Sequence, residues 1–302
     1  MNDPAKPLIS LITLNYNRTA DTIAFLESSR QLSYPNYEII VCDMNSDQDP
    51  GPTISAGDYP YTRFIRSEKN LGFSGGNNLG IRAAKGEYLF IVNNDTVLSA
   101  GILELLLEPM LKSNEIAAVS PKILFYDRPD QIEYAGFNPF NMYTGRTSAR
   151  GYLEKDLGQY NSAEETSGAH GCAMLIRARV LDETGGFPEK FFLYYEEWDL
   201  NLRIRKLGYK IWFQGSAFIY HKGSSSVGNK TPLQTYYMTR NRILLMRRQA
   251  GFFQWMVFLC FFTIFTIPKS IITYFAGGSM KTFRSFVKGI LWNLHSSSRS
   301  IV

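Results

Sequence analysis

A short apolar run that stops at three polar residues constrains the fold of this chain most. Residues 87–98 read EYLFIVNNDTVL, and residues 89–92 have the continuous apolar character of a strand buried on both faces of a sheet. Residues 93–95 (NND) then follow at the carboxyl end of the strand, the edge where open α/β sheets bind ligands. The same three residues are good turn formers, so the cluster alone leaves a simple turn open.

Strands and helices alternate before this run. Apolar strands are predicted at residues 8–14, 38–43 and 62–66, with a helix at residues 19–32 and another that follows a glycine-containing loop and ends at residues 85–86. Four strands that alternate with helices before residue 100 imply a doubly wound, mostly parallel sheet. Polar residues follow these strands too, with Tyr16 after the first strand and Asp43 at the end of the second.

The segment at residues 70–80 (NLGFSGGNNLG) contains several glycines before the predicted helix. It reads G-x-x-G-G and follows the third strand, so it is a poor match to the G-x-G-x-x-G motif of a nicotinamide dehydrogenase. Glycines at the start of a helix can bring backbone N–H groups close to a phosphate. They can equally allow a tight turn and close packing of the helix, and both roles stay open for Gly75.

A helix is predicted to begin near Glu196, within the segment GGFPEKFFLYYEEWDLNLRIRKLGY. At 100° per residue, Glu196 and Asp199 lie within about 60° of each other, whereas Glu197 lies about 160° from Asp199. Asp199 can pair with Arg203 one turn later, and Glu196 suits the first turn of a helix. Glu197 is left without an obvious partner, which suits a general base that reaches into a site.

Three other segments of the chain give weaker indications of structure or of a site. Residues 127–165 are irregular and are expected to form a hairpin or lid. Residues 166–177 (TSGAHGCAMLIR) contain small residues, which leave room for a ligand or for close packing. Residues 209–221 predict a pair of strands that ends at His221, and this histidine can complete a metal site with Asp95.

The last third of the chain has an unusual charge. Residues 200–302 hold 15 of the 32 Lys and Arg residues and none of the 27 Asp and Glu residues. Such a surface indicates an anionic partner, either lipid headgroups or phosphates. The basic residues are interleaved with a long apolar run and do not form a groove-binding motif, so we expect a membrane surface and no nucleic acid.

The apolar run covers residues 252–267 (FFQWMVFLCFFTIFTI), and basic residues at 247–248 and 281–288 flank it. As a helix it spans about 24 Å, less than the roughly 30 Å hydrocarbon core of a bilayer. Basic residues on both flanks place both ends in the cytoplasm, which favours an embedded or re-entrant segment. The alternative is a buried helical hairpin that covers the first domain or forms a homodimer. The three cysteines show no CxxC pair and the amino terminus shows no apolar signal segment, as expected in a reducing cytosol.

Taken in order, these motifs resemble the inverting family-2 glycosyltransferases of the GT-A fold, most closely their rhamnosyltransferase-like branch in bacterial surface-polysaccharide synthesis. The resemblance covers about residues 7–248. It rests on the ordered set of motifs: a strand ending in NYN, a strand ending in Asp43, NLGFSGGNNLG, NND, SGAHGCAML, and FLYYEEWDLNLRIRKLGY followed by His221.

The resemblance implies a donor site at the first four motifs. Asp43 would bind the uracil or thymine base or the ribose, and Tyr16 would lie against the base. Gly75, Asn78 and Asn94 would line the nucleotide and diphosphate region. The Asp-x-Asp metal motif of the family corresponds to residues 93–95, so its first acid is missing here.

The same resemblance implies a metal site and a catalytic site. Asp95 would bind a divalent cation, Mg²⁺ or Mn²⁺, with help from His221. The Glu-Asp pair of the family corresponds to Glu196-Glu197, so Glu197 stands where the catalytic base would be. The acceptor would contact four residues: Gly168, His170, Glu196 and Trp198.

The implied activity is inverting transfer of a sugar from a nucleoside diphosphate to a saccharide acceptor. The best match is L-rhamnose from dTDP-rhamnose, with a lipid-linked acceptor, in cell-wall polysaccharide synthesis at the cytoplasmic face of the plasma membrane. The alternatives are a UDP-sugar donor (GlcNAc, Gal or galactofuranose) and an inactive sugar-nucleotide-binding scaffold. We expect a GT-A catalytic domain at residues 1–235 and a basic, apolar helical tail at residues 236–302 that associates with the membrane.

Overall fold

The computed structural model describes residues 6–223, 231–277 and 279–297. Its strands are β1 (Ile9–Asn15), β2 (Tyr37–Asp43), β3 (Thr62–Arg66), β4 (Tyr88–Val92), β5 (Thr96–Leu98), β6 (Ile116–Phe125), β7 (Ile132–Tyr134), β8 (Ala163–Glu165), β9 (Ala173–Arg177) and β10 (Lys210–His221). Its helices are α1 (Thr19–Ser29), α2 (Gly51–Ala56), α3 (Gly72–Ala83), α4 (Ile102–Lys112), α5 (Ala178–Thr184), α6 (Glu196–Lys206), α7 (Pro232–Gln249), α8 (Phe252–Phe261), α9 (Ile267–Ala276) and α10 (Met280–His295).

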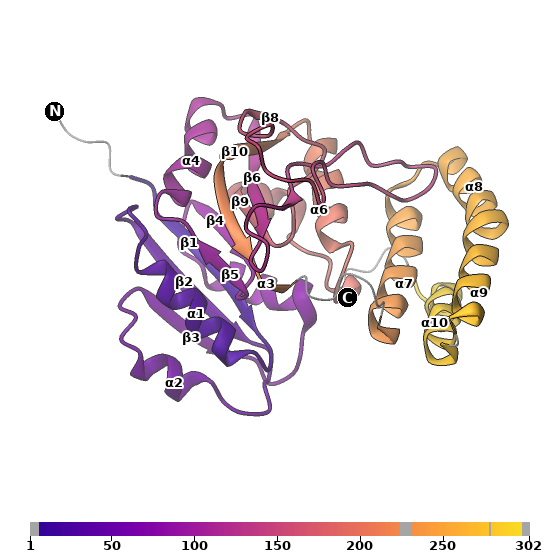
Figure 1. Ribbon diagram of the computed structural model, residues 1–302, viewed down its shortest axis with the longest axis horizontal. Coiled ribbons are helices and arrows are strands. Elements are labelled where there is room, and N and C mark those ends of the chain that lie inside the picture. The colour runs from indigo at the N-terminus through magenta and orange to yellow at the C-terminus, as the bar shows by residue number, and fades with distance from the viewer. Residues whose placement is uncertain (1–5, 224–230, 278, 298–302) are drawn as a thin grey trace.

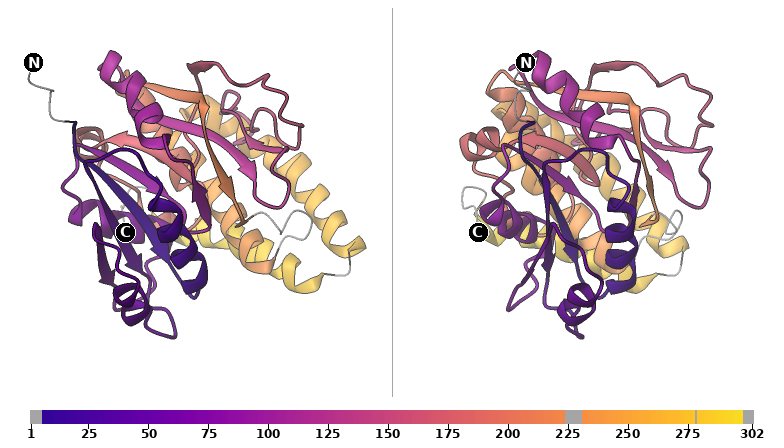
Figure 2. Two further views of the ribbon diagram at one scale, coloured as in Figure 1. Left: turned by 60° about the vertical axis from the view of Figure 1, so that its left-hand side comes forward. Right: turned by 90° about the vertical axis from the view of Figure 1, so that its left-hand side faces the viewer.

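The strands form one sheet with the order β3-β2-β1-β4-β9-β6-β10-β5, with β7 beside β6 and β8 beside β10. The first four strands in that order run parallel, as do β6 and β10, and β9 lies antiparallel between β4 and β6. One core includes Phe25 of α1 and Leu103 of α4, and the other includes Val180 of α5 and Leu200 of α6. Helices therefore cover both faces of the sheet (Figures 1 and 2), which confirms the predicted doubly wound α/β architecture. The sheet is mixed, because four pairs of the named strands are parallel and five are antiparallel.

The register of the parallel strands brings their polar ends together. Asn15 at the end of β1 pairs with Asp43 at the end of β2. Strand β4 runs parallel to β1 and ends at Val92, so residues 93–95 follow at the same edge of the sheet. The edge that the sequence predicts for ligand binding is thus assembled from three strands.

The glycine-rich segment is helical, which corrects the predicted loop. Helix α3 begins at Gly72, so Gly75 and Asn78 lie inside the helix. A Cβ atom on Gly80 would lie 2.3 Å from Ile12 Cγ2 of strand β1. The close approach of α3 to the sheet therefore requires glycine at residue 80, which favours the packing role over the phosphate-binding role at this position.

Two further segments, residues 209–221 and residues 137–149, form regular structure. Residues 209–221 form one long strand, β10, and not a pair of strands, because a bulge between Gln214 and Phe218 shifts its register against β6 without ending it. Residues 137–149 form a hairpin, with Asn141 bridged to Arg146. The tip of this 137–149 hairpin reaches helix α8, where Arg146 lies over the ring of Phe261 at 5.6 Å.

Helices α8, α9 and α10, here called the tail helices, lie beyond α7 on the side away from the strand edge at β3 (Figure 1). A π-helical turn (Phe262–Thr266) joins α8 to α9, just before Pro268, whose ring and missing N–H prevent a regular helical turn. The resulting helix Phe252–Phe275 is long and apolar enough to cross a membrane, by length and composition alone. Only 17% of its most apolar window is buried, so the predicted alternative of a buried hairpin does not fit.

The predicted domain boundary between residues 235 and 236 falls inside helix α7. This helix contacts the loop before α6 and the first turn of α6, while it also packs closely against α10. Helix α7 therefore packs against both parts of the chain, and the division into a catalytic domain and a tail stays a prediction.

Gly80→Ala tests the packing of α3 on the sheet. We expect it to lower the free energy of unfolding by about 1–3 kcal/mol, because the new Cβ would overlap Ile12 in a closely packed core. A Cβ on Gly101 would meet nothing within 4 Å, so Gly101→Ala is the control and should change stability by less than about 0.5 kcal/mol. Urea unfolding monitored by circular dichroism measures both variants, and equal stability of the two would contradict this account of α3.

Candidate active site

A chain of hydrogen bonds joins the polar ends of β1, β2 and β4. Asn15 donates from Nδ2 to Asp43 Oδ1 at 2.8 Å and accepts from the Thr22 hydroxyl at 2.8 Å. Asn94 Nδ2 donates to the same Thr22 hydroxyl at 2.8 Å. These bonds fix the three strand ends relative to one another, so the edge forms a preorganised surface for a ligand.

Asp43 lies at the base of this edge. Its side chain is fully buried, accepts a hydrogen bond from the Ser46 N–H at 3.0 Å, and lies 3.3 Å from Arg66 Nη1. Tyr16, which follows β1, is 50% exposed and presents its ring at the same edge. The structure thus gives Asp43 a role in shaping the loop after β2, and direct contact of Asp43 and Tyr16 with a nucleoside stays a prediction.

Gly75 and Asn78 occupy the first turns of α3. Asn78 donates from Nδ2 to Phe187 O at 2.7 Å and to Glu189 Oε1 at 3.2 Å, and its Oδ1 accepts from the Phe187 N–H at 3.0 Å. Its amide therefore holds the segment before α6 against α3. Contact of Gly75, Asn78 and Asn94 with a diphosphate stays a prediction.

Asp95 and His221 lie together, as the metal-site prediction requires. His221 Nε2 lies 3.2 Å from Asp95 Oδ1, and His221 Nδ1 lies 2.8 Å from Glu133 Oε2. The pairing of β10 with β5 produces this arrangement, because it sets His221 opposite Thr96, the residue after Asp95. Burial opposes the charge on His221, but contacts with Cys172, Asp95 and Glu133 raise its pKa above the ordinary value.

These residues fit a cation that is shared with a substrate. Among the described residues, no three His, Cys, Asp or Glu side chains are arranged to hold a metal ion by themselves. A carboxylate on one ring nitrogen, as Glu133 provides to His221, is the usual way to orient a metal-binding histidine. Mg²⁺ commonly takes one or two protein ligands and completes its shell with substrate phosphates and water.

The segment before α6 has a strained backbone. Phe192, Tyr194 and Tyr195 have φ values of 63°, 69° and 72°, in the left-handed region that non-glycine residues rarely adopt. The side chain of Asn241 on α7 donates to the carbonyl oxygens of this segment, at Phe191, Leu193 and Tyr194, over 2.7–2.9 Å. Helix α7 therefore holds the strained segment in place.

Glu196 and Glu197 follow directly at the first turn of α6. Burial raises the pKa of Glu197 to about 7, against the lowering effect of backbone N–H groups of Tyr195, Glu197 and Trp198. Burial and the adjacent charge of Glu197 raise the pKa of Glu196 well above its ordinary value. A carboxyl group that titrates near neutral pH is suited to proton transfer.

Asp199 has the structural role that its spacing predicts. Its carboxylate is fully buried and lies 2.7 Å from Arg203 Nε. It also accepts from Arg248 Nε at 2.9 Å and from Gln249 Nε2 at 2.7 Å, both at the end of α7. Asp199 therefore joins α7 to α6 and is not available for catalysis.

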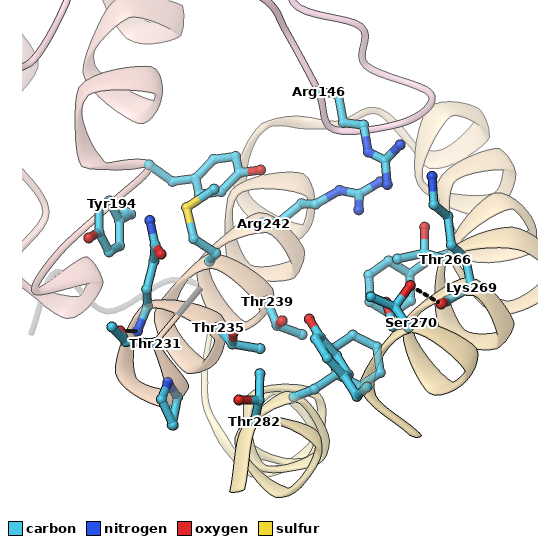
Figure 3. A pocket seen from close by; sticks show the side chains of 18 of the residues that line it. Arg146, Tyr194, Thr231, Thr235, Thr239, Arg242, Thr266, Lys269, Ser270 and Thr282 are labelled. Carbon is cyan, nitrogen blue, oxygen red and sulfur yellow. Dashed lines mark hydrogen bonds between the residues drawn. The ribbon is translucent and has the colours of Figure 1, made fainter. Parts of the chain in front are cut away.

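A cavity of about 1230 Å³ lies beside Glu197 (Figure 3). Its walls come from the start of α6, the 137–149 hairpin, α7, the π turn, α9 and α10. Glu197 and Trp198 line this cavity, whereas Gly168 and His170 do not. Helix α7 and the segments that follow it thus form most of the wall that the candidate base faces.

Gly168 and His170 lie behind the cavity wall. The ring of His170 stacks on Phe137 at 5.6 Å, and Trp198 contacts the same ring at 4.8 Å. Gly168 accepts a hydrogen bond from the Tyr134 hydroxyl at 2.9 Å. Burial lowers the pKa of His170 to about 4, so its imidazole is neutral at pH 7. Contact of Gly168, His170 and Glu196 with an acceptor stays a prediction.

Sequence patterns alone missed three contributors to the site. Glu133 lies on β7, in a region that the sequence predicts only as irregular, and nothing in its local pattern indicates a contact with His221. Asn241 and Arg242 lie on α7, in the segment that the sequence predicts only as part of a basic tail. The signal that could have indicated them is two polar residues followed by an apolar run within a predicted helix.

The sequence model of glycosyl transferase family 2 matches residues 10–185, more than half of the chain, so the protein belongs to this family. It is accordingly a glycosyltransferase that acts on a nucleotide sugar.

Two relatives are similar over most of their length. The low-salt glycan biosynthesis hexosyltransferase Agl10 of Haloferax volcanii is 27% identical over 78% of this chain and 74% of its own. The N-acetylglucosaminyl-diphospho-decaprenol L-rhamnosyltransferase of Mycobacterium tuberculosis is 23% identical over 73% of this chain and 78% of its own.

Two solved structures confirm the GT-A fold. GalNAc-T7, crystallised with UDP, GalNAc and Mn²⁺, superposes with a TM-score of 0.64 at 13% identity. The match covers 82% of this chain but only 48% of GalNAc-T7, so this chain corresponds to about half of that protein. The mannosyltransferase PcManGT of Pyrobaculum calidifontis, in complex with GDP-Man and Mn²⁺, superposes with a TM-score of 0.58 at 15% identity. This match covers 98% of this chain and 83% of PcManGT.

Asn241→Asp tests whether α7 holds the segment before α6. The variant keeps the size of the side chain but turns carboxylate oxygens toward three carbonyl groups, so we expect a loss of about 2–3 kcal/mol of stability. Asn138→Asp, on the exposed face of the 137–149 hairpin, is the matched control and should be nearly neutral. Differential scanning calorimetry compares the two variants. An unchanged melting temperature for Asn241→Asp would show that the hydrogen bonds from Asn241 to this segment are not needed for stability.

Proposed function

We propose that this protein is an inverting glycosyltransferase that moves a sugar from a nucleoside diphosphate to a lipid-linked saccharide at the cytoplasmic face of the plasma membrane. The observation that carries the proposal is the position of Glu197. It lies at the first turn of α6, has a pKa near 7, and faces a cavity large enough for a saccharide. The donor edge at β1, β2 and β4 supplies a separate place for the nucleotide.

The reaction is a single displacement. The Glu197 carboxylate takes the proton of the acceptor hydroxyl, and that oxygen forms a bond to the anomeric carbon of the donor sugar. The bond between the anomeric carbon and the diphosphate oxygen breaks at the same time, and the nucleoside diphosphate leaves with the electron pair. Attack opposite the leaving group inverts the configuration at the anomeric carbon.

The other residues position these groups. The hydrogen-bond network of Asn15, Asp43 and Asn94 forms the donor edge. The hydrogen bonds from Asn241 to the segment before α6 set the direction of α6. Asp95 and His221 would hold a divalent cation, Mg²⁺ or Mn²⁺, which supplies charge stabilisation to the leaving diphosphate. The Mn²⁺ in the two solved relatives of this fold supports that proposal.

The names of the relatives support the substrate proposal. The mycobacterial relative is an L-rhamnosyltransferase that acts on a diphospho-decaprenol acceptor, and the other is a hexosyltransferase. We therefore propose L-rhamnose from dTDP-rhamnose as the donor, with a UDP-sugar as the alternative. An inactive scaffold is less consistent with Glu197, since a binding protein has no need for a carboxyl group that titrates near pH 7 beside an open cavity.

The exposed apolar face of the tail helices supports a membrane surface as partner. Phe252, Phe265 and Ile272 are 82%, 61% and 68% exposed, all on helix Phe252–Phe275. Single exposed apolar residues are ordinary, but several large ones on one helix mark an interaction surface. The Lys and Arg residues of the same region would add headgroup attraction of about 1 kcal/mol each. A homodimer through this face remains a further proposal.

Glu197→Gln should remove sugar transfer and leave donor binding nearly intact. The amide keeps size and hydrogen bonding but cannot accept a proton, so we expect a fall in kcat of about 10²-fold or more. The wild-type rate should fall as the pH drops through about 7, because the protonated carboxyl group cannot act as a base. Glu196→Gln is the control. A near-normal rate for Glu197→Gln together with a large loss for Glu196→Gln would assign the base to the other carboxylate.

Asp95→Asn tests the cation site. In the wild-type protein, donor affinity measured by isothermal titration should rise with Mn²⁺ or Mg²⁺ and fall with chelator. In Asp95→Asn the affinity should become insensitive to the ion, with a loss of about 10–100-fold relative to the metal-loaded wild type. Donor binding by the wild type that does not change with chelator would remove the metal role of both Asp95 and His221.

The triple variant Phe252→Glu, Phe265→Glu, Ile272→Glu tests the membrane surface. These exposed positions allow charge without disturbing a core, and the variant should lose flotation with anionic vesicles. Leu157→Glu, at a 79% exposed residue of the catalytic domain, is the matched control and should float like the wild type. Wild-type flotation should weaken in high salt. A wild-type protein that stays in the lower fraction with anionic vesicles rules out the membrane proposal.

A further inference from the structure

We propose that the cavity beside Glu197 contains a phosphate site, and that this site binds the diphosphate of the lipid-linked acceptor. The site is a cluster of four basic residues, here called the cation cluster: Arg146, Arg242, Lys269 and Lys281. The inference rests on the proposed function and deepens it, because it says which group of the acceptor is recognised and by which residues.

The cation cluster converges from four separate parts of the chain. Arg146 comes from the tip of the 137–149 hairpin, Arg242 from α7, Lys269 from α9 and Lys281 from α10, and all four line the same cavity. Figure 3 shows the guanidinium groups of Arg146 and Arg242 pointing toward each other, with Lys269 on the adjacent wall. Like charges repel each other, so the approach of the Arg146 and Arg242 guanidinium groups favours a bound anion between them.

The charge of the cluster is not compensated by protein carboxylates. Among the described residues, no ion pair involves any of its four members, and Glu197 is the one carboxylate that lines the cavity. The chain has no Asp or Glu after Asp199, so α7, α9 and α10 have none to offer. Like charges that meet in a partly enclosed space repel each other, and a bound anion would relieve that repulsion.

Arg242 is the buried member of the cluster. It is 7% exposed, donates from Nε to the Thr144 carbonyl oxygen at 3.0 Å, and lies over the rings of Phe258 and Phe262 at 5.6 and 5.4 Å. These contacts fix its position but supply no negative charge. A fixed guanidinium group in a desolvated wall is the arrangement that suits binding of a phosphate.

Thr266 is a second buried polar residue in the same wall of the cavity. It is 7% exposed, lines the cavity, and its hydroxyl has no hydrogen-bond partner among the described residues. It ends the π turn, a helical irregularity that is frequent at functional sites. A buried hydroxyl without a partner costs free energy unless a ligand satisfies it, and a phosphate oxygen can accept its hydrogen bond.

The surroundings favour an acceptor diphosphate over a free phosphate. The cavity reaches from the cation cluster to Glu197, so an anion there would be part of the molecule whose hydroxyl Glu197 activates. Lys269 lies on the helix between Phe265 and Ile272, which are 61% and 68% exposed. A lipid chain attached to the diphosphate would therefore leave the cavity along an apolar surface.

The test uses the full chain and the double variant Lys269→Gln, Lys281→Gln, with Arg146→Gln added in a triple variant. All three residues are exposed, so the variants should fold. The control is Arg284→Gln, Lys288→Gln, which removes the same charge from exposed residues of α10 that do not line the cavity. The acceptors are N-acetylglucosaminyl diphosphate with a short alkyl chain and the matching alkyl glycoside without phosphate, both in detergent.

The cluster variants should raise the KM for the diphosphate acceptor at least about 10-fold, the usual effect of lost charge-assisted hydrogen bonds. The KM for the alkyl glycoside, the donor affinity and the KM of the control should change less than about twofold. An equal rise for both acceptors, or none for either, overturns the proposal. If the variants lose only their flotation with anionic vesicles, the anion is a bilayer headgroup and the assignment to the acceptor is wrong.

A binding measurement separates this inference from the proposed function. Isothermal titration with inorganic pyrophosphate, in EDTA, should show binding by the wild type that the cluster variants lose and the control keeps. If the wild type binds pyrophosphate in this way but transfers no sugar, the phosphate site stands and the proposed function fails. If transfer occurs but pyrophosphate binding is absent or equal in all variants, the function stands and the phosphate site is wrong.

Discussion

The side-chain amide of Asn241 is the contact on which the active site depends. It donates to the carbonyl oxygens of Phe191, Leu193 and Tyr194, in a segment whose left-handed backbone would not persist without external support. That segment leads directly into α6, so its shape decides where Glu197 points. Arg248 and Gln249 bind Asp199 one turn further on, which makes α7 a second fixed point for the same helix.

We propose that this arrangement divides the substrates between two parts of the chain. The sheet edge at Asn15, Asp43 and Asn94 lies at the carboxyl ends of the parallel strands and would receive the nucleotide. The cavity on the other side of Glu197 is formed largely by α7 and the tail helices (Figure 3). The tail helices therefore contribute to the wall of the cavity that we propose receives the acceptor, as well as to the surface that we propose meets the membrane.

The sequence predicts the sheet and its polar edge well, because strand ends are local features. Buried runs ending at Asp43 and Asp95 are visible as patterns, and so is the Asp199–Arg203 pair one helical turn apart. It does not predict contacts between distant segments. The hydrogen bond from Asn241 to residue 191 and the pairing of His221 with Glu133 depend on how the chain folds back, which no local spacing encodes. The sequence places the start of α3 too late for a different reason, since close packing on Ile12 overrides the poor helix propensity of glycine.

The central claim is that donor and acceptor bind on opposite sides of Glu197, with the acceptor side built by α7 and the tail helices. Amide hydrogen exchange on the full-length protein tests it most directly, with donor nucleotide and diphosphate acceptor added separately. We predict that the nucleotide slows exchange at residues 15–18, 43–46 and 93–95, and that the acceptor slows exchange at residues 144–147, 192–198 and 266–274. Acceptor protection confined to the sheet edge, with none in α7, α9 or the 137–149 hairpin, would contradict the account.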